Sequence, residues 1–278
     1  MQKKYIFSFI ILIISTIIYF YQKSIKENYP LNSPDFKIIN IYNRKNDSKT
    51  YTQGLMFSDD KKSIFESAGL YKESGIKQLE YPSLKLIKEQ KINSNYFGEG
   101  IAKCGNFIYQ LTWREKKIIK YNYKNLEKIE ELEMDNKIKE GWGLSNSNNN
   151  NELFATDGSD KIYRLDCNNN LKVIEIINVK YNGRSINYLN DLCYAEGYIF
   201  LNIYFLNKIA KVNINNGDII LFYNMQSLID FELKKGILTR SKLSQGDVLN
   251  GIDYNEKKKT FLITGKRWGY MYEIKFNK

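Results

Sequence analysis

Tyr51-Thr-Gln-Gly-Leu55 is the first of five similar openings along the chain. In each, a turn-rich cluster of Gly, Glu or Asn leads into a Leu or Ile, and short alternating strands follow. The later openings are Phe97-Gly-Glu-Gly-Ile101, Glu140-Gly-Trp-Gly-Leu144, Tyr188-Leu-Asn-Asp-Leu192 and Val248-Leu-Asn-Gly-Ile252. Their closing aliphatic residues lie 46, 43, 48 and 60 residues apart. A repeat of about 40 to 50 residues built from short strands is typical of a propeller blade. The sequence therefore predicts an all-β, five-bladed β-propeller.

The openings also predict where a functional site would lie. In a propeller, the first and innermost strand of each blade lines the central channel, so five openings would meet at one face. They would bring together the polar and aromatic side chains of Gln53, Glu99, Trp142, Asn190, Asp191 and Asn250.

Ring closure and one insertion complete the predicted architecture. The segment 36–42 reads as a strand, and we expect it to close the ring by pairing with the C-terminal strand from Gly269 to Phe276. The segment from Met225 to Gln245 breaks the repeat and accounts for the longest spacing. Its Leu228-Ile-Asp-Phe-Glu-Leu run predicts a short helix over one face.

The N-terminus predicts entry into the secretory pathway. An apolar run from about Tyr5 to Tyr21 follows Lys3 and Lys4, as in a signal peptide or an uncleaved signal anchor. The sequence leaves these two alternatives open. We expect a signal or anchor over 1–22, a linker over 23–35 and the propeller over 36–278. The propeller would then be lumenal, secreted or held at a membrane on its lumenal or extracellular side.

Composition excludes several kinds of chemistry. The 278 residues contain no His, which removes the Ser-His-Asp triad, the Cys-His dyad and His-based zinc sites. The net charge is +11, but the lysines are scattered, so we expect no nucleic-acid partner. The three cysteines, Cys104, Cys167 and Cys193, lack metal-binding spacing. At most one intrachain disulfide could form, and free thiols are the favoured interpretation.

Glu99 is the strongest candidate for acid–base chemistry. It lies between Gly98 and Gly100, and a cleft ringed by Phe97, Trp113 and Trp142 would remove its solvation and raise its pKa. The alternative is that Glu99 caps a turn. The tryptophans could equally be packing between blades, and Lys266, at the end of a strand, is more often a solvated surface group.

Ten short blocks, taken together, resemble the plant-type glutaminyl-peptide cyclotransferases, which are five-bladed propellers. The blocks occur in order and span about Tyr42 to Ile274. They are Tyr51-Thr-Gln-Gly-Leu55, Phe65-Glu-Ser-Ala-Gly-Leu-Tyr71, Tyr96-Phe-Gly-Glu-Gly100, Leu111-Thr-Trp113, Gly141-Trp-Gly-Leu144, Thr156-Asp-Gly158, Tyr181-Asn-Gly183, Leu189-Asn-Asp-Leu192, Val248-Leu-Asn-Gly-Ile252 and Thr264-Gly-Lys266.

The resemblance implies an enzyme that converts the N-terminal glutamine of a peptide to pyroglutamate and releases ammonia. It implies catalytic roles for Glu99 as acid/base and for Asn190 and Lys266. It implies that substrate is bound by Tyr51, Gln53, Phe97, Trp113, Trp142 and Tyr204. Catalysis would need no cofactor, although a structural calcium in the channel would be compatible. The partners would be peptides that begin with glutamine, and a monomer is expected.

Two departures from the family pattern keep other functions open. Tyr204 stands where the family usually has Trp, and Leu189-Asn-Asp-Leu-Cys193 replaces a more acidic Leu-Asn-Glu-Leu-Glu. These changes favour an alternative, a catalytically inactive propeller that binds peptides or glycans. A second alternative is a metal-dependent lactonase, which would use Glu99, Asn190 and Asp191 as metal ligands. That class, however, has six blades.

Overall fold

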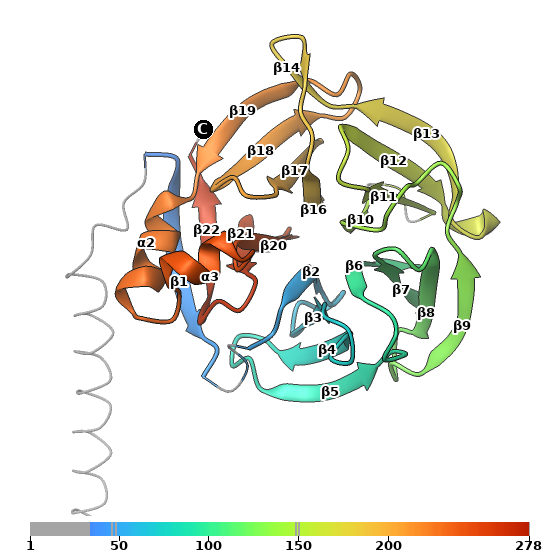
Figure 1. Ribbon diagram of the computed structural model, residues 1–278, viewed down its shortest axis with the longest axis horizontal. Coiled ribbons are helices and arrows are strands. Elements are labelled where there is room, and N and C mark those ends of the chain that lie inside the picture. The colour runs from blue at the N-terminus through green and yellow to red at the C-terminus, as the bar shows by residue number, and fades with distance from the viewer. Residues whose placement is uncertain (1–33, 46, 48, 148, 150, 278) are drawn as a thin grey trace, which may run out of the picture.

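The chain folds into a ring of antiparallel sheets around a central axis (Figure 1). The computed structural model describes residues 34–277 except 46, 48, 148 and 150. Over this part there are five four-stranded sheets, so the predicted all-β, five-bladed propeller is confirmed. Blade one comprises β2 (Thr52–Phe57), β3 (Ser63–Ala68), β4 (Gly75–Glu80) and β5 (Leu86–Lys91). Blade two comprises β6 (Gly98–Cys104), β7 (Phe107–Thr112), β8 (Lys117–Asn122) and β9 (Lys128–Glu133).

The remaining blades follow in chain order. Blade three comprises β10 (Leu144–Asn146), β11 (Glu152–Thr156), β12 (Lys161–Asp166) and β13 (Lys172–Asn178). Blade four comprises β16 (Leu189–Ala195), β17 (Tyr198–Ile203), β18 (Lys208–Asn213) and β19 (Ile219–Asn224). Blade five comprises β20 (Leu249–Asn255), β21 (Thr260–Gly265), β22 (Tyr270–Phe276) and β1 (Phe36–Asn43). A small hairpin of β14 (Lys180–Tyr181) and β15 (Arg184–Ser185), which we did not predict, lies between blades three and four.

The two ends of the propeller close the ring together. Strand β1 pairs antiparallel with β22, from Phe36 opposite Phe276 to Asn43 opposite Tyr270. This confirms the predicted closure. Because the first strand belongs to the last blade, the ring cannot open without breaking a sheet.

Four of the five innermost strands contain an irregularity in register at the opening. The shifts fall between Thr52 and Gly54, Gly98 and Ile101, Leu189 and Leu192, and Leu249 and Ile252. A bulge inserts an extra residue, bends the strand and re-aims a side chain. Four of the repeated openings therefore share a backbone feature, which aims the side chains of Gln53, Glu99, Asn190 and Asn250 differently from those of their neighbours.

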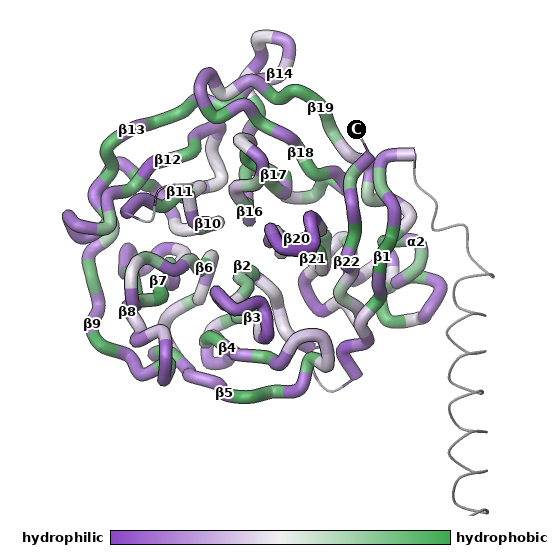
Figure 2. The backbone as a smooth tube through the Cα atoms, turned by 180° about the vertical axis from the view of Figure 1, so that it is seen from behind, coloured by the Kyte–Doolittle hydropathy of each residue, from purple (hydrophilic) through white to green (hydrophobic). Residues whose placement is uncertain are grey.

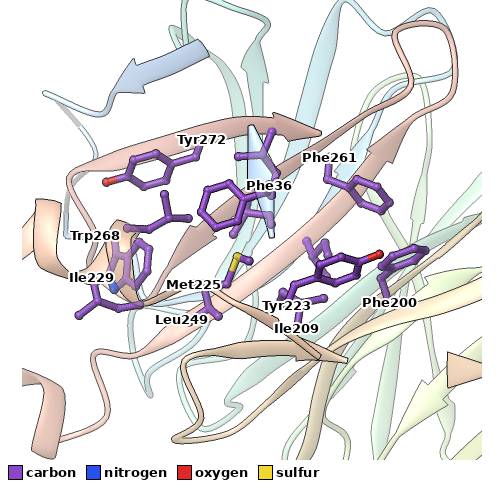
Figure 3. Close-up of a cluster of buried hydrophobic side chains, with 14 of the residues drawn as sticks. Phe36, Phe200, Ile209, Tyr223, Met225, Ile229, Leu249, Phe261, Trp268 and Tyr272 are labelled. Carbon is purple, nitrogen blue, oxygen red and sulfur yellow. The ribbon is translucent and has the colours of Figure 1, made fainter. Parts of the chain in front are cut away.

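The hydrophobic core lies between the blades. The largest cluster joins blades four and five and includes Phe36, Phe200, Phe261, Trp268 and Tyr272 (Figure 3). Trp268 is fully buried there, so the packing interpretation is correct for this tryptophan. Near the axis, by contrast, β20 is coloured mainly as hydrophilic (Figure 2). Apolar packing thus holds the blades together and leaves polar groups at the centre.

The insertion forms two helices, α2 (Gln226–Lys234) and α3 (Arg240–Ser244), beside blade five (Figure 1). The predicted helix is confirmed as α2, and α3 was missed. Leu228, Ile229 and Phe231 of α2 enter the large core cluster. The buried carboxylate of Glu232 accepts hydrogen bonds from the backbone N–H groups of Gly269 and Tyr270, at 3.0 and 3.1 Å. The insertion is therefore anchored at the start of β22, where blade five meets the channel face.

A disulfide joins blades two and three, between Cys104 at the end of β6 and Cys167 just after β12. Our favoured interpretation of free thiols is thus wrong for these two residues, because the fold brings together positions that are 63 residues apart. Cys193 is free and buried in the core between blades four and five.

The predicted signal or anchor and nearly all of the predicted linker lie outside the described residues. Within 34–277, apart from the four gaps, no helix has the length and apolarity needed to cross a membrane.

Candidate active site

Glu99 and Gln53 meet where blades one and two adjoin. The Glu99 side chain is buried, with 5% of the residue exposed, and its Oε1 accepts a hydrogen bond of 2.9 Å from Gln53 Nε2. Gln53 Oε1 in turn accepts a bond of 3.2 Å from Asn250 Nδ2 of blade five. Three of the repeated openings therefore converge in one hydrogen-bonded chain, as the spacing predicts.

Gly100 lets blade three approach Glu99 closely. Its N–H donates to the Trp142 carbonyl at 2.7 Å, and a Cβ at this position would lie 2.3 Å from the Leu144 nitrogen. No real Cβ tolerates such a contact with backbone, so a side chain here would push blade three away. The glycine after Glu99 is thus required by packing between blades.

The surroundings of Glu99 favour its protonated form. Burial raises the pKa of the Glu99 carboxyl well above its usual range. The positive charge of Lys266 opposes this increase in pKa, whereas the nearby carboxylates of Glu140, Asp191 and Glu115 add to it. A carboxyl group with a raised pKa can both accept and return a proton near neutral pH.

Lys266 is buried, which corrects the expectation of a solvated lysine. It directly follows β21, and only 3% of the residue is exposed. Its Nζ lies 4.9 Å from the ring centre of Tyr51 and 4.7 Å from that of Tyr204. Burial lowers the pKa of Lys266 to about 8, although Glu99 and two aspartates favour its charged form. No carboxylate within the described residues forms an ion pair with it, so its charge faces aromatic rings.

Aromatic side chains continue from this lysine around the site. The Phe97 ring contacts Tyr51 edge-on at 6.2 Å between ring centres and Trp113 at 5.6 Å. On the other side, Trp142 contacts Tyr204 at 5.8 Å. All five aromatic residues that the resemblance implied are therefore brought together.

Glu140 joins the two tryptophans and was missed by the sequence analysis. Its Oε2 accepts from the indole nitrogen of Trp113 at 2.7 Å and from that of Trp142 at 3.1 Å. Its Oε1 accepts from Nε of Arg114 at 3.1 Å. A clue was available, because Glu140 occupies the first place of the third opening, where Tyr51 and Phe97 stand in the first two.

Asn190 and Asp191 lie on β16 and have different surroundings. Oδ1 of Asn190 is buried and has no hydrogen-bond partner, and the residue is 2% exposed. Oδ2 of Asp191 accepts from the Ile252 N–H at 2.9 Å and so ties blade four to blade five. Asp191 is thus a structural link, and Cys193 lies in the core. Neither Asp191 nor Cys193 therefore belongs to the aromatic walls, whereas the other departure from the family pattern, Tyr204, does line the site.

Among the described residues, no group of three or more Cys, Asp or Glu is arranged to hold a metal. The five blades also contradict the lactonase alternative, which needs six.

Comparisons with known proteins agree with this geometry. The family model described as glutamine cyclotransferase matches residues 12–276. The glutaminyl-peptide cyclotransferase of Arabidopsis thaliana is 32% identical over 230 residues, which are 82% of this chain and 68% of that protein. The crystal structure of Myxococcus xanthus glutaminyl cyclase has the same fold, with a TM-score of 0.76 and 24% identity over 88% of this chain and 99% of that one. The chain belongs to the glutamine cyclotransferase family.

Proposed function

We propose that the chain is a glutaminyl-peptide cyclotransferase, an acyltransferase, with Glu99 as its acid/base. The reaction converts the N-terminal glutamine of a peptide to pyroglutamate and releases ammonia. The observation that carries the proposal is one buried carboxyl with a raised pKa, beside a buried lysine and inside a ring of aromatic side chains. Membership of the family supports the activity.

The chemistry requires one group that moves a proton. The substrate's α-amine nitrogen attacks its own side-chain carboxamide carbon, forming the lactam C–N bond, and the bond to the departing nitrogen breaks. The free α-ammonium has a pKa of about 7.7–8.0, so it must lose a proton before it attacks. That first proton passes to solvent. As the neutral amine attacks, its nitrogen gives a further proton to the Glu99 carboxylate, which passes it to the departing NH2 group, so that ammonia leaves. Gln53 holds the Glu99 carboxylate in place through the bond at 2.9 Å.

Lys266 and Asn190 serve the substrate's carboxamide group in this proposal. Negative charge develops on the carboxamide oxygen during attack, and a preformed positive charge in a site with little water stabilises it strongly. With a pKa of about 8, Lys266 is mostly charged at neutral pH. The buried Asn190 amide, whose oxygen has no protein partner, orients the substrate amide.

The aromatic walls hold the substrate in a reactive geometry. Tyr51, Phe97, Trp113, Trp142 and Tyr204 surround the glutamine side chain and exclude water. Intramolecular attack already has a large entropic advantage once its geometry is fixed. Tyr204 still presents a ring to Lys266, which favours activity over the inactive peptide- or glycan-binding alternative.

Catalysis as proposed passes through no cofactor. A structural calcium fits the chemistry of the channel, because Oδ1 atoms of Asn190, Asp191 and Asn250 are buried oxygens without partners. Oxygen donors of this kind are the ones calcium prefers. These residues would hold such an ion, and it would stabilise the packing of the inner strands.

We also propose the setting in which the enzyme works. The disulfide between Cys104 and Cys167 supports an oxidising compartment, as the secretory pathway provides. The substrates are peptides or proteins with N-terminal glutamine, the enzyme works as a monomer, and nucleic acid is not a partner. If the N-terminal segment is retained, it holds the propeller at a membrane.

Ammonia release from a glutamine-initiated dipeptide tests the proposal. The full-length protein is assayed in detergent with excess EDTA, and Glu99→Gln is the matched control. Release by the wild type and at least ~100-fold less by the variant is expected, since acid–base catalysis contributes about 10²–10⁴-fold. Absence of release from folded wild type, even after calcium is added, would favour the binding alternative.

A further inference from the structure

We propose that Glu140 is a positioning residue that braces the two tryptophan walls of the site through a single carboxylate. The inference deepens the proposed function, on which its kinetic part rests. It assigns Glu140 an effect on how tightly the substrate's glutamine side chain is held.

The brace closes a ring of contacts around the site. Starting at Tyr51, the contacts pass to Phe97, then Trp113, and reach Glu140. From Glu140 they continue through Trp142, Tyr204 and Lys266 back to Tyr51. Within this ring, the Glu140 side chain joins the Trp113 indole to the Trp142 indole by hydrogen bonds.

A carboxylate suits this place for a chemical reason. An indole N–H can only donate, so holding two indoles requires an oxygen that accepts from both. Oε2 of Glu140 does so at 2.7 and 3.1 Å. The second oxygen is fixed by Arg114, whose guanidinium also stacks 3.7 Å from the centre of the Trp113 ring. Both oxygens of the Glu140 carboxylate are therefore held by hydrogen bonds.

The brace also acts on Glu99 through charge. Burial is the main reason that the pKa of Glu99 is raised, and Glu140 is one of the carboxylates that raise it further. The other charged groups that act on Glu99 are Lys266, which opposes the shift, and Asp191 and Glu115, which reinforce it. Removing the charge of Glu140 should therefore lower the pKa of Glu99 and move the acid limb of activity to lower pH.

Two substitutions separate the geometric role from the electrostatic one. Glu140→Ala removes both, whereas Glu140→Gln keeps an oxygen that can accept from the indoles. For Glu140→Ala we expect kcat/KM to fall at least ~10-fold, mainly through KM, which corresponds to about 1.4 kcal/mol. For Glu140→Gln we expect KM within about threefold of wild type, with the acid limb moved to lower pH.

Acrylamide quenching of tryptophan fluorescence reports on the brace without using activity. Trp268 is fully buried, so quenching comes from Trp113 and Trp142, which are half-buried. We expect stronger quenching in Glu140→Ala and nearly wild-type quenching in Glu140→Gln. Glu115→Gln is the matched control, because Glu115 contacts the Tyr71 hydroxyl and the Phe97 N–H but no indole. It should leave quenching unchanged.

The role of Glu140 and the proposed function are each overturned by a different result. Wild-type quenching and wild-type KM in Glu140→Ala would overturn the brace. If Glu140→Ala does not fold, Trp113→Phe and Trp142→Phe, which delete one donor each, must raise KM, and wild-type kinetics in both would overturn it. A wild type that releases no ammonia would count against the proposed function, and quenching alone would then judge the brace.

Discussion

Two clusters of charged side chains in this propeller contain buried groups, yet their charges are satisfied to different degrees. The first, here called the closure latch, consists of Arg44, Asp47, Glu66 and Lys77 where the first strand meets blade one. Arg44 Nη2 lies 2.8 Å from both Glu66 oxygens and 2.9 Å from Asp47. Lys77 pairs with Asp47. The second cluster is the active site, with Glu99 and Lys266.

The difference in partners separates a structural cluster from a functional one. In the latch, both carboxylates have a cation, and Thr52 also donates to Glu66 at 2.5 Å. In the site, Glu99 accepts a hydrogen bond from the Gln53 amide. Lys266 lies over two aromatic rings and has no ion pair in the part of the chain that the structure describes. Buried charge that is fully paired can hold a fold together. Buried charge left partly unpaired is available to bind a substrate or to exchange a proton with it.

Breaking the closure latch should have the largest effect, a loss of folding stability. Arg44→Met leaves the buried Glu66 carboxylate without its cation and Asp47 with Lys77 alone, and we expect about 3–5 kcal/mol less stability by urea unfolding. Lys117→Met, which removes an exposed pair with Glu133, is the control and should leave the stability nearly unchanged. A loss for Arg44→Met as small as that of the control would contradict the assigned role.

Removing the charge of Glu99 in the active site should reduce activity without lowering the stability of the fold. Glu99→Gln should reduce ammonia release at least ~100-fold, about 2.7 kcal/mol, for the reason given above. Its free energy of unfolding should stay equal to that of wild type or rise, because a buried amide replaces a group whose charged form is desolvated. Thermal unfolding measures this. A variant that was both inactive and much less stable would show that Glu99 has a structural role, like the residues of the closure latch.

The charge on Lys266 should set the alkaline limit of activity. Its pKa is lowered to about 8, so it loses its proton as the pH rises through about 8, and stabilisation of the oxygen is lost with it. We expect kcat at saturating substrate to fall above this pH by up to about tenfold per pH unit. Lys266→Arg, which stays charged, should lower activity but move this limit to higher pH. An unchanged limit in that variant would assign it to another group.

The smallest expected effect concerns Tyr204. Tyr204→Phe keeps the ring 4.7 Å from Lys266 and should change kcat/KM by less than about threefold. Tyr204→Leu removes the cation–π contact, which is worth about 0.5–2 kcal/mol. It should lower the pKa of Lys266 and move the alkaline limit to lower pH. Profiles of kcat against pH distinguish the two variants, and equal profiles would show that the ring is not needed.

Much of this architecture could be predicted because the repeat is local in sequence. The five blades were predicted from the repeated openings, and the pairing of the first and last strands followed from the need to close a ring. The short hairpin of β14 and β15 and helix α3 were missed. Each is too short for hydrophobic periodicity to reveal it.

The candidate site was predictable as a set of residues, and its internal connections were not. Glu99 and Gln53 were named from their places in the openings, but the link through Glu140 depends on two indoles turning toward one oxygen. Likewise, Lys266 reads as a surface residue in the sequence, because burial at the end of β21 depends on Tyr51 and Tyr204 from other blades.

The sequence by itself determined the five blades and the polar residues that face the channel, since both follow from the repeated openings. It also determined the ring closure, since a ring must join its first and last strands. The tertiary structure alone decided the disulfide between Cys104 and Cys167, the burial of Lys266 and the brace at Glu140. These depend on contacts between blades, where side chains far apart in the chain share one environment. Burial and charge in that shared environment set the pKa values and hydrogen bonds that the chemistry uses.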